Sequence, residues 1–199
     1  MKTALLALAL LAAPAAALAE YAPDTNPAHV KAGSYKVEPS HTRILFAVSH
    51  MGFTTWYGEF TGASGTLTLD PNSLAATKFD IILPSKTIST SNTKLDGELN
   101  SPEWFDTAKY PAIEFKSGTV VRTGPDTAAV TGELTFHGVT RPETLQVSFN
   151  AAGINGLTNQ YTAGFEATGV IKRSDFNQST YVPLIGDDVR LIISVAFVQ

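Results

Sequence analysis

The sequence predicts an all-β fold: a single antiparallel β-barrel of about eight strands with a short helical insertion near residues 92–108. Apolar and polar residues alternate over most of the chain, which is the period of a pleated strand. Clusters of Asp, Asn, Gly and Pro separate the alternating segments, and one stretch alone carries helix signals. A sandwich fits the same pattern, but long strands with one apolar face favour a barrel because closure removes exposed edges.

The first 19 residues have the features of a secretory signal peptide that is cleaved after Ala19. Lys2 supplies the charged start, an apolar run covers residues 4–13, and small residues precede Glu20. This run is shorter than the roughly 20 apolar residues of a spanning helix. We therefore expect an exported chain with an irregular leader over residues 20–34 and one domain over residues 35–199.

Composition narrows the class of protein further. The 199 residues contain no cysteine, which predicts a chain without disulfides, thiolate nucleophile or cysteine-linked lipid anchor. Export without disulfides indicates the periplasm of a bacterial envelope. Without residues 1–19 the chain has 13 basic and 18 acidic residues, a net charge of −5, and this balance argues against a nucleic-acid partner.

The strands of the first half are predicted from apolar residues at every second position. The first clear run ends at the Met51-Gly52 turn, and Asp70-Pro71-Asn72 forms a later turn. The residues that share the apolar face of these strands are Ile44, Phe46, Val48, His50, Trp56, Gly58, Phe60, Leu67, Leu69, Phe79, Ile81 and Leu83.

The insertion is predicted to contain two short helical pieces. Thr93 and Asp96 resemble a capping box, and Leu95 with Leu99 makes an i, i+4 pair. Ser101 as an N-cap followed by Pro102, with Tyr110-Pro111 as the stop, predicts a second helical piece over residues 101–110. Both pieces are too short to be stable alone, so they must pack on the strands.

Strands resume after the insertion and continue to the end of the chain. Gly124-Pro125-Asp126 and Asn155-Gly156 supply turn signals between them, and a further turn is expected over residues 138–142. The residues that share the apolar face here are Ile113, Phe115, Val130, Gly132, Leu134, Phe136, Leu145, Val147, Phe149, Tyr161, Ala163, Phe165, Ala167, Gly169, Ile171, Val189, Leu191, Ile193, Val195 and Phe197.

Five segments, in order, resemble the YceI-like periplasmic family between Tyr35 and Phe197. They are HTRILFAVSHMGF from His41, GEFTGASGTL from Gly58, LNSPEWFDTAKYPAIEF from Leu99, GELTFHGVTRPETL from Gly132 and IKRSDF from Ile171. The resemblance implies a lipocalin-like barrel that holds a long apolar molecule, a polyisoprenoid or an isoprenoid quinone, with no enzymatic activity. Two departures stand out: Glu98 occupies the place of a histidine, and Asn177 that of a glycine.

The apolar face supplies the candidate ligand-binding residues. Aromatic side chains alternate there with glycine and alanine, which leaves room for a ligand, whereas a barrel filled by its own side chains is the alternative. The expected ligand-binding residues are Phe46, Val48, His50, Trp56, Phe60, Trp104, Phe105, Phe115, Phe136, Phe149, Phe165 and Arg173. No catalytic residue, no metal ligand and no cofactor other than the bound lipid are expected.

Three of these residues carry specific expectations. Trp104 and Phe105 either cover the ligand or anchor the insertion to the barrel. Arg173 lies at the end of an apolar strand face, where it either contacts a ligand head group or pairs with Asp175, and the structural pair is favoured. The four histidines lack metal-ligand spacing, and His50 is expected to form hydrogen bonds at a barrel end.

The leading hypothesis is a periplasmic binding protein that transports or stores an isoprenoid lipid, namely a polyprenyl phosphate or an isoprenoid quinone. The alternatives are an enzyme acting on an isoprenoid or other amphiphile, a stress-response module with an incidental cavity, and a small outer-membrane barrel. For partners we expect the lipid itself, without nucleic acid and without a membrane-spanning segment. Transient membrane contact and a homodimer stay open.

Overall fold

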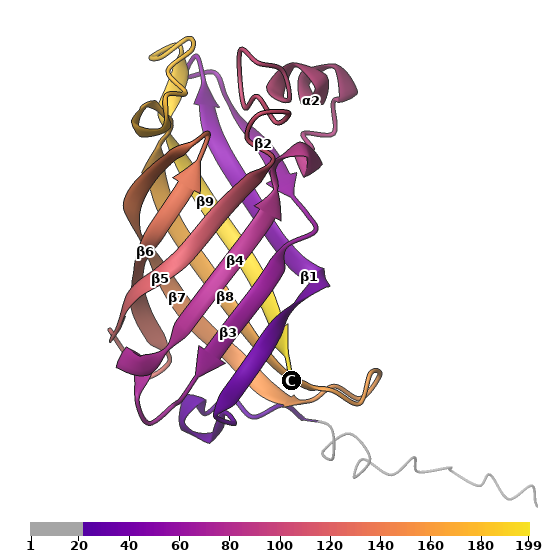
Figure 1. Cartoon of the computed structure of the whole chain (residues 1–199), viewed down its shortest axis with the longest axis vertical. Helices are drawn as coiled ribbons and strands as arrows, with labels where there is room; N and C mark the ends of the chain where they lie inside the picture. Colours follow the sequence, from indigo (N-terminus) through magenta and orange to yellow (C-terminus); the bar gives the residue numbers. More distant parts are fainter. Residues whose placement is uncertain (1–21) are drawn as a thin grey trace, which may run out of the picture.

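The alternating segments form a closed antiparallel β-barrel in the computed structural model, which describes residues 22–199 (Figure 1). The predicted fold class is therefore confirmed, while the predicted signal peptide lies outside the described residues. The strands are β1 (Gly33–His50), β2 (Thr54–Phe60), β3 (Ser64–Leu69), β4 (Lys78–Pro84), β5 (Ala112–Arg122), β6 (Thr127–Phe136), β7 (Val139–Ile154), β8 (Tyr161–Lys172) and β9 (Ile185–Val198).

Nine strands make a ring of eight positions because β2 and β3 lie end to end beside β1. β2 pairs with the later part of β1, with Ile44 opposite Phe60, and β3 pairs with the beginning of β1, with Lys36 opposite Thr66. β1 also pairs with β9 along its other edge, and this pairing closes the ring. We call the end with α2 and the β1–β2 turn the upper end, and the end with the C-terminus the lower end (Figure 1).

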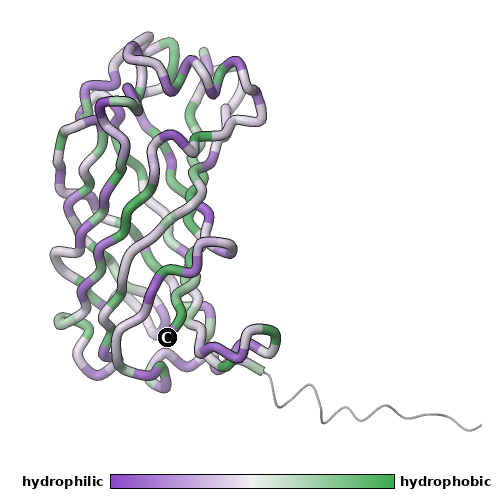
Figure 2. Tube along the Cα trace, turned by 45° about the vertical axis from the view of Figure 1, so that its right-hand side comes forward, coloured by the Kyte–Doolittle hydropathy of each residue, from purple (hydrophilic) through white to green (hydrophobic). Residues whose placement is uncertain are grey.

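The apolar face of the alternation points into the barrel. On β8 the inward positions include the buried Ala163 and Ala167, whereas Thr168 and Lys172 on the opposite face are exposed. Figure 2 shows the same change between apolar and polar residues along the strands. An outer-membrane barrel would carry its apolar face outside, so this arrangement counts against that alternative. Within residues 22–199, no helix is long and apolar enough to cross a membrane.

The leader and the first strand differ from their predicted limits. Residues 27–29 form a 3₁₀ helix, η1 (Pro27–His29), and β1 begins at Gly33, well before the alternation from Ile44. The register of β1 on β9 shifts between Glu38 and Arg43, and this irregularity hides the early half of the strand from a period-2 analysis. Asp24 bridges to Ala152 on β7 through two backbone hydrogen bonds of 2.8 Å, so the leader packs against the lower end.

The insertion between β4 and β5 crosses the upper end beside β2 (Figure 1). It contains η3 (Ser85–Thr87) and α2 (Thr93–Leu99), which confirms the first predicted helical piece. Its N-cap is Asn92, however, whose side chain accepts hydrogen bonds from the backbone of Lys94 and Leu95. The 3₁₀ helices η2 (Leu74–Ala76) and η4 (Arg173–Phe176) complete the fold.

The second predicted helical piece, over residues 101–110, is wrong. A helix starting at Ser101 would bond the Phe105 N–H to Ser101 O, but this N–H donates to Leu99 O at 2.9 Å, and Asp106 has a φ of 44°. Capping preferences contribute about 1 kcal/mol, whereas burying an aromatic ring contributes about 2 kcal/mol or more. The segment therefore forms consecutive turns that direct Trp104 and Phe105 onto the barrel.

The turn predicted over residues 138–142 is shorter in the structure. Only His137 and Gly138 connect β6 to β7, and Pro142 lies within β7 opposite Glu133. Both turn residues have positive φ, and a Cβ on Gly138 would meet the Tyr110 ring at 2.5 Å.

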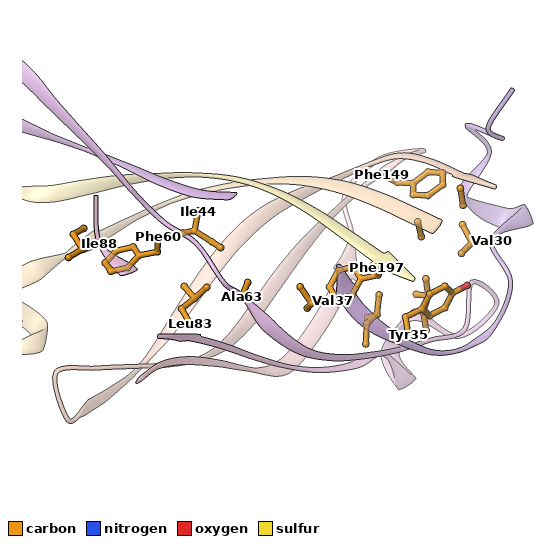
Figure 3. Packing of buried hydrophobic residues seen from close by; sticks show 14 of the residues in the cluster. Val30, Tyr35, Val37, Ile44, Phe60, Ala63, Leu83, Ile88, Phe149 and Phe197 are labelled. Carbon is orange, nitrogen blue, oxygen red and sulfur yellow. The ribbon is translucent and has the colours of Figure 1, made fainter. Parts of the chain in front are cut away.

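Buried apolar side chains of the first cluster extend along the barrel from one end to the other. In Figure 3, Phe60, Leu83 and Ile88 lie toward one end, and Tyr35 and Val30 lie toward the other. Tyr35 is 1% exposed and its hydroxyl donates to Lys31 O, so the leader helps to close the lower end. A second cluster of Leu134, Phe136, Ile171 and Phe176 lies below the insertion.

Candidate ligand-binding cavity

A cavity of about 580 Å³ occupies the interior of the barrel. Each of the nine strands contributes lining residues, for example Ile44 on β1, Leu67 on β3 and Ile193 on β9. The volume lies within the range of small-molecule sites. The glycine and alanine residues of the inner face therefore leave space that the aromatic rings do not fill, and the fully packed barrel is not what the structure shows.

All twelve residues that the sequence nominates line this cavity. Strand residues at every second position place their side chains on one face, and the barrel brings these faces together although the strands are far apart in the sequence. The twelve are Phe46, Val48, His50, Trp56, Phe60, Trp104, Phe105, Phe115, Phe136, Phe149, Phe165 and Arg173. Whether they contact a ligand stays a prediction.

Trp104 and Phe105 occupy different positions at the upper end. The Phe105 ring packs between Phe60 and Phe136, with centroids 6.1 and 5.2 Å away, and joins both buried clusters. The Trp104 ring packs against the first of these clusters and lies 6.2 Å from the ring of Tyr181, which is exposed. Phe105 thus anchors the insertion to the barrel, whereas the role of Trp104 as a cover over the cavity stays a prediction.

Arg173 holds the upper rim together through backbone carbonyl groups. Its guanidinium donates to Gly186 O at 2.8 Å, Gln178 O at 2.7 Å, and Thr180 O and Ile185 O at 2.9 Å each. The predicted pair with Asp175 is wrong, because Asp175 is exposed and four carbonyls take its place. Burial lowers the pKa of Arg173, but its ordinary value is high enough that it stays charged.

Gln178 connects this rim to the insertion. Gln178 is 4% exposed, and its side-chain Nε2 donates to the backbone oxygen of Trp104 at 2.9 Å. Its backbone carbonyl accepts a hydrogen bond from Arg173. The position of Trp104 therefore depends on Arg173 through one intervening residue.

Asn177 shows how the chain accommodates its departure from the family pattern. It follows η4 with a φ of 60° and a ψ of 27°, the left-handed conformation in which glycine is most common and asparagine is tolerated. The other departure, Glu98 on α2, lines the cavity at its upper end.

The histidines have separate surroundings. The His50 ring stacks on Trp56 with centroids 5.1 Å apart, and His41 Nδ1 lies 2.6 Å from a Glu38 carboxylate oxygen. Within the described residues, no group of three or more His, Cys, Asp or Glu side chains could hold a metal ion.

Glu143 has an inward carboxyl group, although it is not among the twelve expected ligand-binding residues. Glu143 lies on β7 two positions before Leu145, so it shares the face of Leu145 and Val147, and it lines the cavity opposite Gly132. Its carboxyl group has no hydrogen bond or ion pair among residues 22–199. Burial, and to a lesser extent the charge of Asp175, raises its pKa above the ordinary glutamate value.

Glu143→Gln is expected to change how stability depends on pH. Because the pKa is raised in the folded state, the carboxyl favours folding below its ordinary pKa, and this contribution is lost as the pH rises through the raised pKa. The substitution should raise the free energy of unfolding at neutral pH by at most about 1 kcal/mol, since the carboxyl is only partly buried.

Urea unfolding at acidic and neutral pH measures this effect, with Glu133→Gln on the exposed face of β6 as the control. If the free energy of unfolding depends on pH in the same way in Glu143→Gln, in Glu133→Gln and in the unchanged chain, burial in the cavity does not raise the pKa of Glu143.

Comparison with known proteins agrees with this architecture. A family model described as the YceI-like domain matches residues 35–197. The chain is 38% identical over 170 residues to Protein YceI of Escherichia coli O6:H1, covering 84% of this chain and 88% of that relative.

Two solved structures share the fold. BcnA of Burkholderia cenocepacia has a TM-score of 0.73 and 21% identity, covering 80% of this chain and 98% of that one. A polyisoprenoid binding domain from Saccharophagus degradans, implicated in plant cell wall breakdown, has a TM-score of 0.63 and 14% identity. The alignment covers 85% of this chain and 99% of that domain.

Proposed function

The chain belongs to the YceI-like family, and from that premise we propose that it is a periplasmic binding protein that holds a long isoprenoid lipid inside its barrel for transport or storage. The observation that carries the proposal is the apolar cavity enclosed by all nine strands. The structural neighbour whose name states polyisoprenoid binding supports this ligand class.

The chemistry of the cavity lining suits an apolar chain. Burying one methylene group contributes about 0.8 kcal/mol, and an isoprenoid tail contains many carbon atoms. Losing the freedom of that tail cancels much of the gain, so affinity follows from how well the tail fits and not from its area alone. A polyprenyl phosphate and an isoprenoid quinone share this tail and differ in the head group.

A binding role without turnover is proposed because the guanidinium of Arg173, the cation of the cavity rim, is already occupied in holding the fold. Arg173 donates to four carbonyls, and His50 stacks on Trp56. If the chain were an enzyme acting on such lipids, Arg173, His50 or the carboxyl of Glu143, which is unpartnered among residues 22–199, would have to act on the substrate. Stoichiometric binding with no product would support the binding role.

Native mass spectrometry of the protein purified from its own periplasm tests the proposal. We expect one long-chain isoprenoid per barrel, and extraction of the lipid gives its mass and head group. The proposal fails if the purified protein carries no long-chain species and also binds neither an isoprenoid quinone nor a polyprenyl phosphate.

Trp104→Ala is expected to speed ligand release at least about fivefold while costing less stability than Phe105→Ala, because its ring lines the cavity beside the exposed Tyr181 and packs against only one of the two buried clusters. Phe105→Ala should instead cost about 3 kcal/mol, since its ring joins two buried clusters. Ligand transfer to empty vesicles and thermal unfolding measure the two effects. If Trp104→Ala changes neither folding nor ligand retention, Trp104 is neither a cover nor an anchor.

A further inference from the structure

The upper rim exposes an apolar patch built from two loops that are far apart in the sequence. Met51 and Phe53 lie in the turn after β1 and are 50% and 86% exposed, while Tyr181 and Leu184 lie before β9 and are 62% and 56% exposed. The Met51 N–H donates to Leu184 O at 2.7 Å, which joins the two loops. We call these four residues the apolar tip.

The apolar tip is uncharged. Residues 44–58 and 176–186 contain no Asp, Glu, Lys or Arg and only one histidine, although 16% of the chain is charged. The insertion on the same end is different, because α2 and the turns after it carry Lys94, Glu103 and Lys109. A large exposed apolar patch without charges marks an interaction surface with an apolar partner.

The apolar tip is continuous with the cavity. Tyr181 belongs to both, since it lines the cavity beside Trp104. His50 and Ile185, the chain neighbours of Met51 and Leu184, line the cavity as well and are paired between β1 and β9. An apolar molecule that leaves the cavity at this end would pass directly beside the apolar tip.

We propose that the apolar tip docks on the surface of a lipid bilayer, so that the ligand passes between the membrane and the barrel without crossing water. The inference rests on the proposed function, because only a membrane-soluble ligand needs such a route. Apolar and aromatic side chains at a loop end suit the interfacial region of a bilayer. A second copy of the chain is a poorer fit, since a stable dimer buries about 800 Å² on each partner, more than four side chains supply.

Flotation of the ligand-loaded protein with phosphatidylcholine vesicles tests the inference. The test variant is Phe53→Ser with Leu184→Ser. The matched control is Ile154→Ser with Leu157→Ser, which removes two side chains that are 46% and 97% exposed at the lower end, one from the last residue of β7 and one from the β7–β8 turn. We expect vesicle binding to fall at least about tenfold in the test variant and to stay unchanged in the control.

The remaining outcomes overturn the inference. It fails if the unchanged protein does not float with vesicles, or if the test and control variants bind equally. It also fails if sedimentation shows that the test substitutions dissociate a dimer without affecting flotation, because the apolar tip would then join two copies. The single variants Phe53→Ser and Leu184→Ser give the same comparison if the double variant unfolds.

Native mass spectrometry separates this inference from the proposed function. A protein that carries an isoprenoid but does not bind vesicles contradicts the membrane docking alone. A protein that carries no long-chain species and binds neither an isoprenoid quinone nor a polyprenyl phosphate contradicts the proposed function, whatever its vesicle binding.

Discussion

Arg173→Met is expected to lower the free energy of unfolding by about 3 kcal/mol or more, which for a domain of this size corresponds to roughly 6–12 °C in Tm. The substitution keeps an unbranched apolar stem, which is shorter than that of arginine, and removes every donor, so the carbonyls of Gln178, Thr180, Ile185 and Gly186 lose their partner together. Hydrogen bonds to charged groups contribute about 1.5–3 kcal/mol each. At the rim, water can bond to some of the freed carbonyls, so the expected loss is smaller than the sum of the four bonds.

Urea unfolding with Lys172→Met as the control measures the effect. Lys172 is the sequence neighbour of Arg173, but its side chain is 58% exposed and pairs with an exposed Asp188, so its loss should lower the free energy of unfolding far less than the loss of Arg173. Arg173→Lys should recover little of the stability that Arg173→Met loses, since an ammonium group cannot donate in the planar, forked geometry of a guanidinium. A cost below about 1 kcal/mol for Arg173→Met would show that the four bonds do not hold the rim.

The same substitution should also weaken ligand retention. Gln178 links Arg173 to Trp104, so loosening the loop over residues 177–184 also loosens the ring that covers the cavity. Ligand release in Arg173→Met is therefore expected to be at least as fast as in Trp104→Ala. Unchanged release in a destabilised protein would mean that the rim supports the fold without controlling the cavity.

Ala167→Trp is expected to reduce the bound ligand at least about tenfold, because it places an indole ring in the cavity. Ala167 is a small inward residue in the middle of β8, paired with Val147 on β7 and Ile193 on β9, and it lines the cavity. A ring that takes the place of ligand carbon atoms removes their burial, and overpacking adds about 1–3 kcal/mol of its own.

The matched control is Val170→Trp, which adds the same ring to the outer face of the same strand at a side chain that is 56% exposed. Ligand occupancy is measured by native mass spectrometry, and folding by circular dichroism. If the tryptophan variant does not fold, Ala167→Leu takes its place. The smaller leucine side chain should cause a smaller loss of bound ligand. Full occupancy in both Ala167 variants would place the ligand outside the cavity.

The inner face of the barrel could be predicted from residue order. A strand places every second side chain on one face, so the alternation alone places Phe46, Phe149 and Phe165 on one surface without any knowledge of strand pairing. The same rule would also have placed Glu143 inside, two positions before Leu145. A prediction from apolar residues passes over Glu143 because a charged residue is seldom buried.

The helical insertion shows the limit of local signals. The helix over Thr93–Leu99 is stabilised by contacts close in sequence, including its Asn92 cap, and could be predicted. Residues 101–110 carry equally good capping signals but form turns, because Phe105 is held between Phe60 and Phe136. Burial of these rings against distant strands outweighs the local preference.

The sequence by itself determined the strand period, the inward face and the family, because each depends on residue type and order along the chain. Only the tertiary structure decided which groups meet at the ends of the barrel: the four carbonyls around Arg173 in place of Asp175, the Gln178 link to Trp104, and the joining of Met51 to Leu184. These contacts bring together loops up to about 130 residues apart. The pairing of β1 with β9 closes the ring and thereby fixes where these loops lie relative to one another. No local sequence pattern encodes a contact between residues so far apart in the chain.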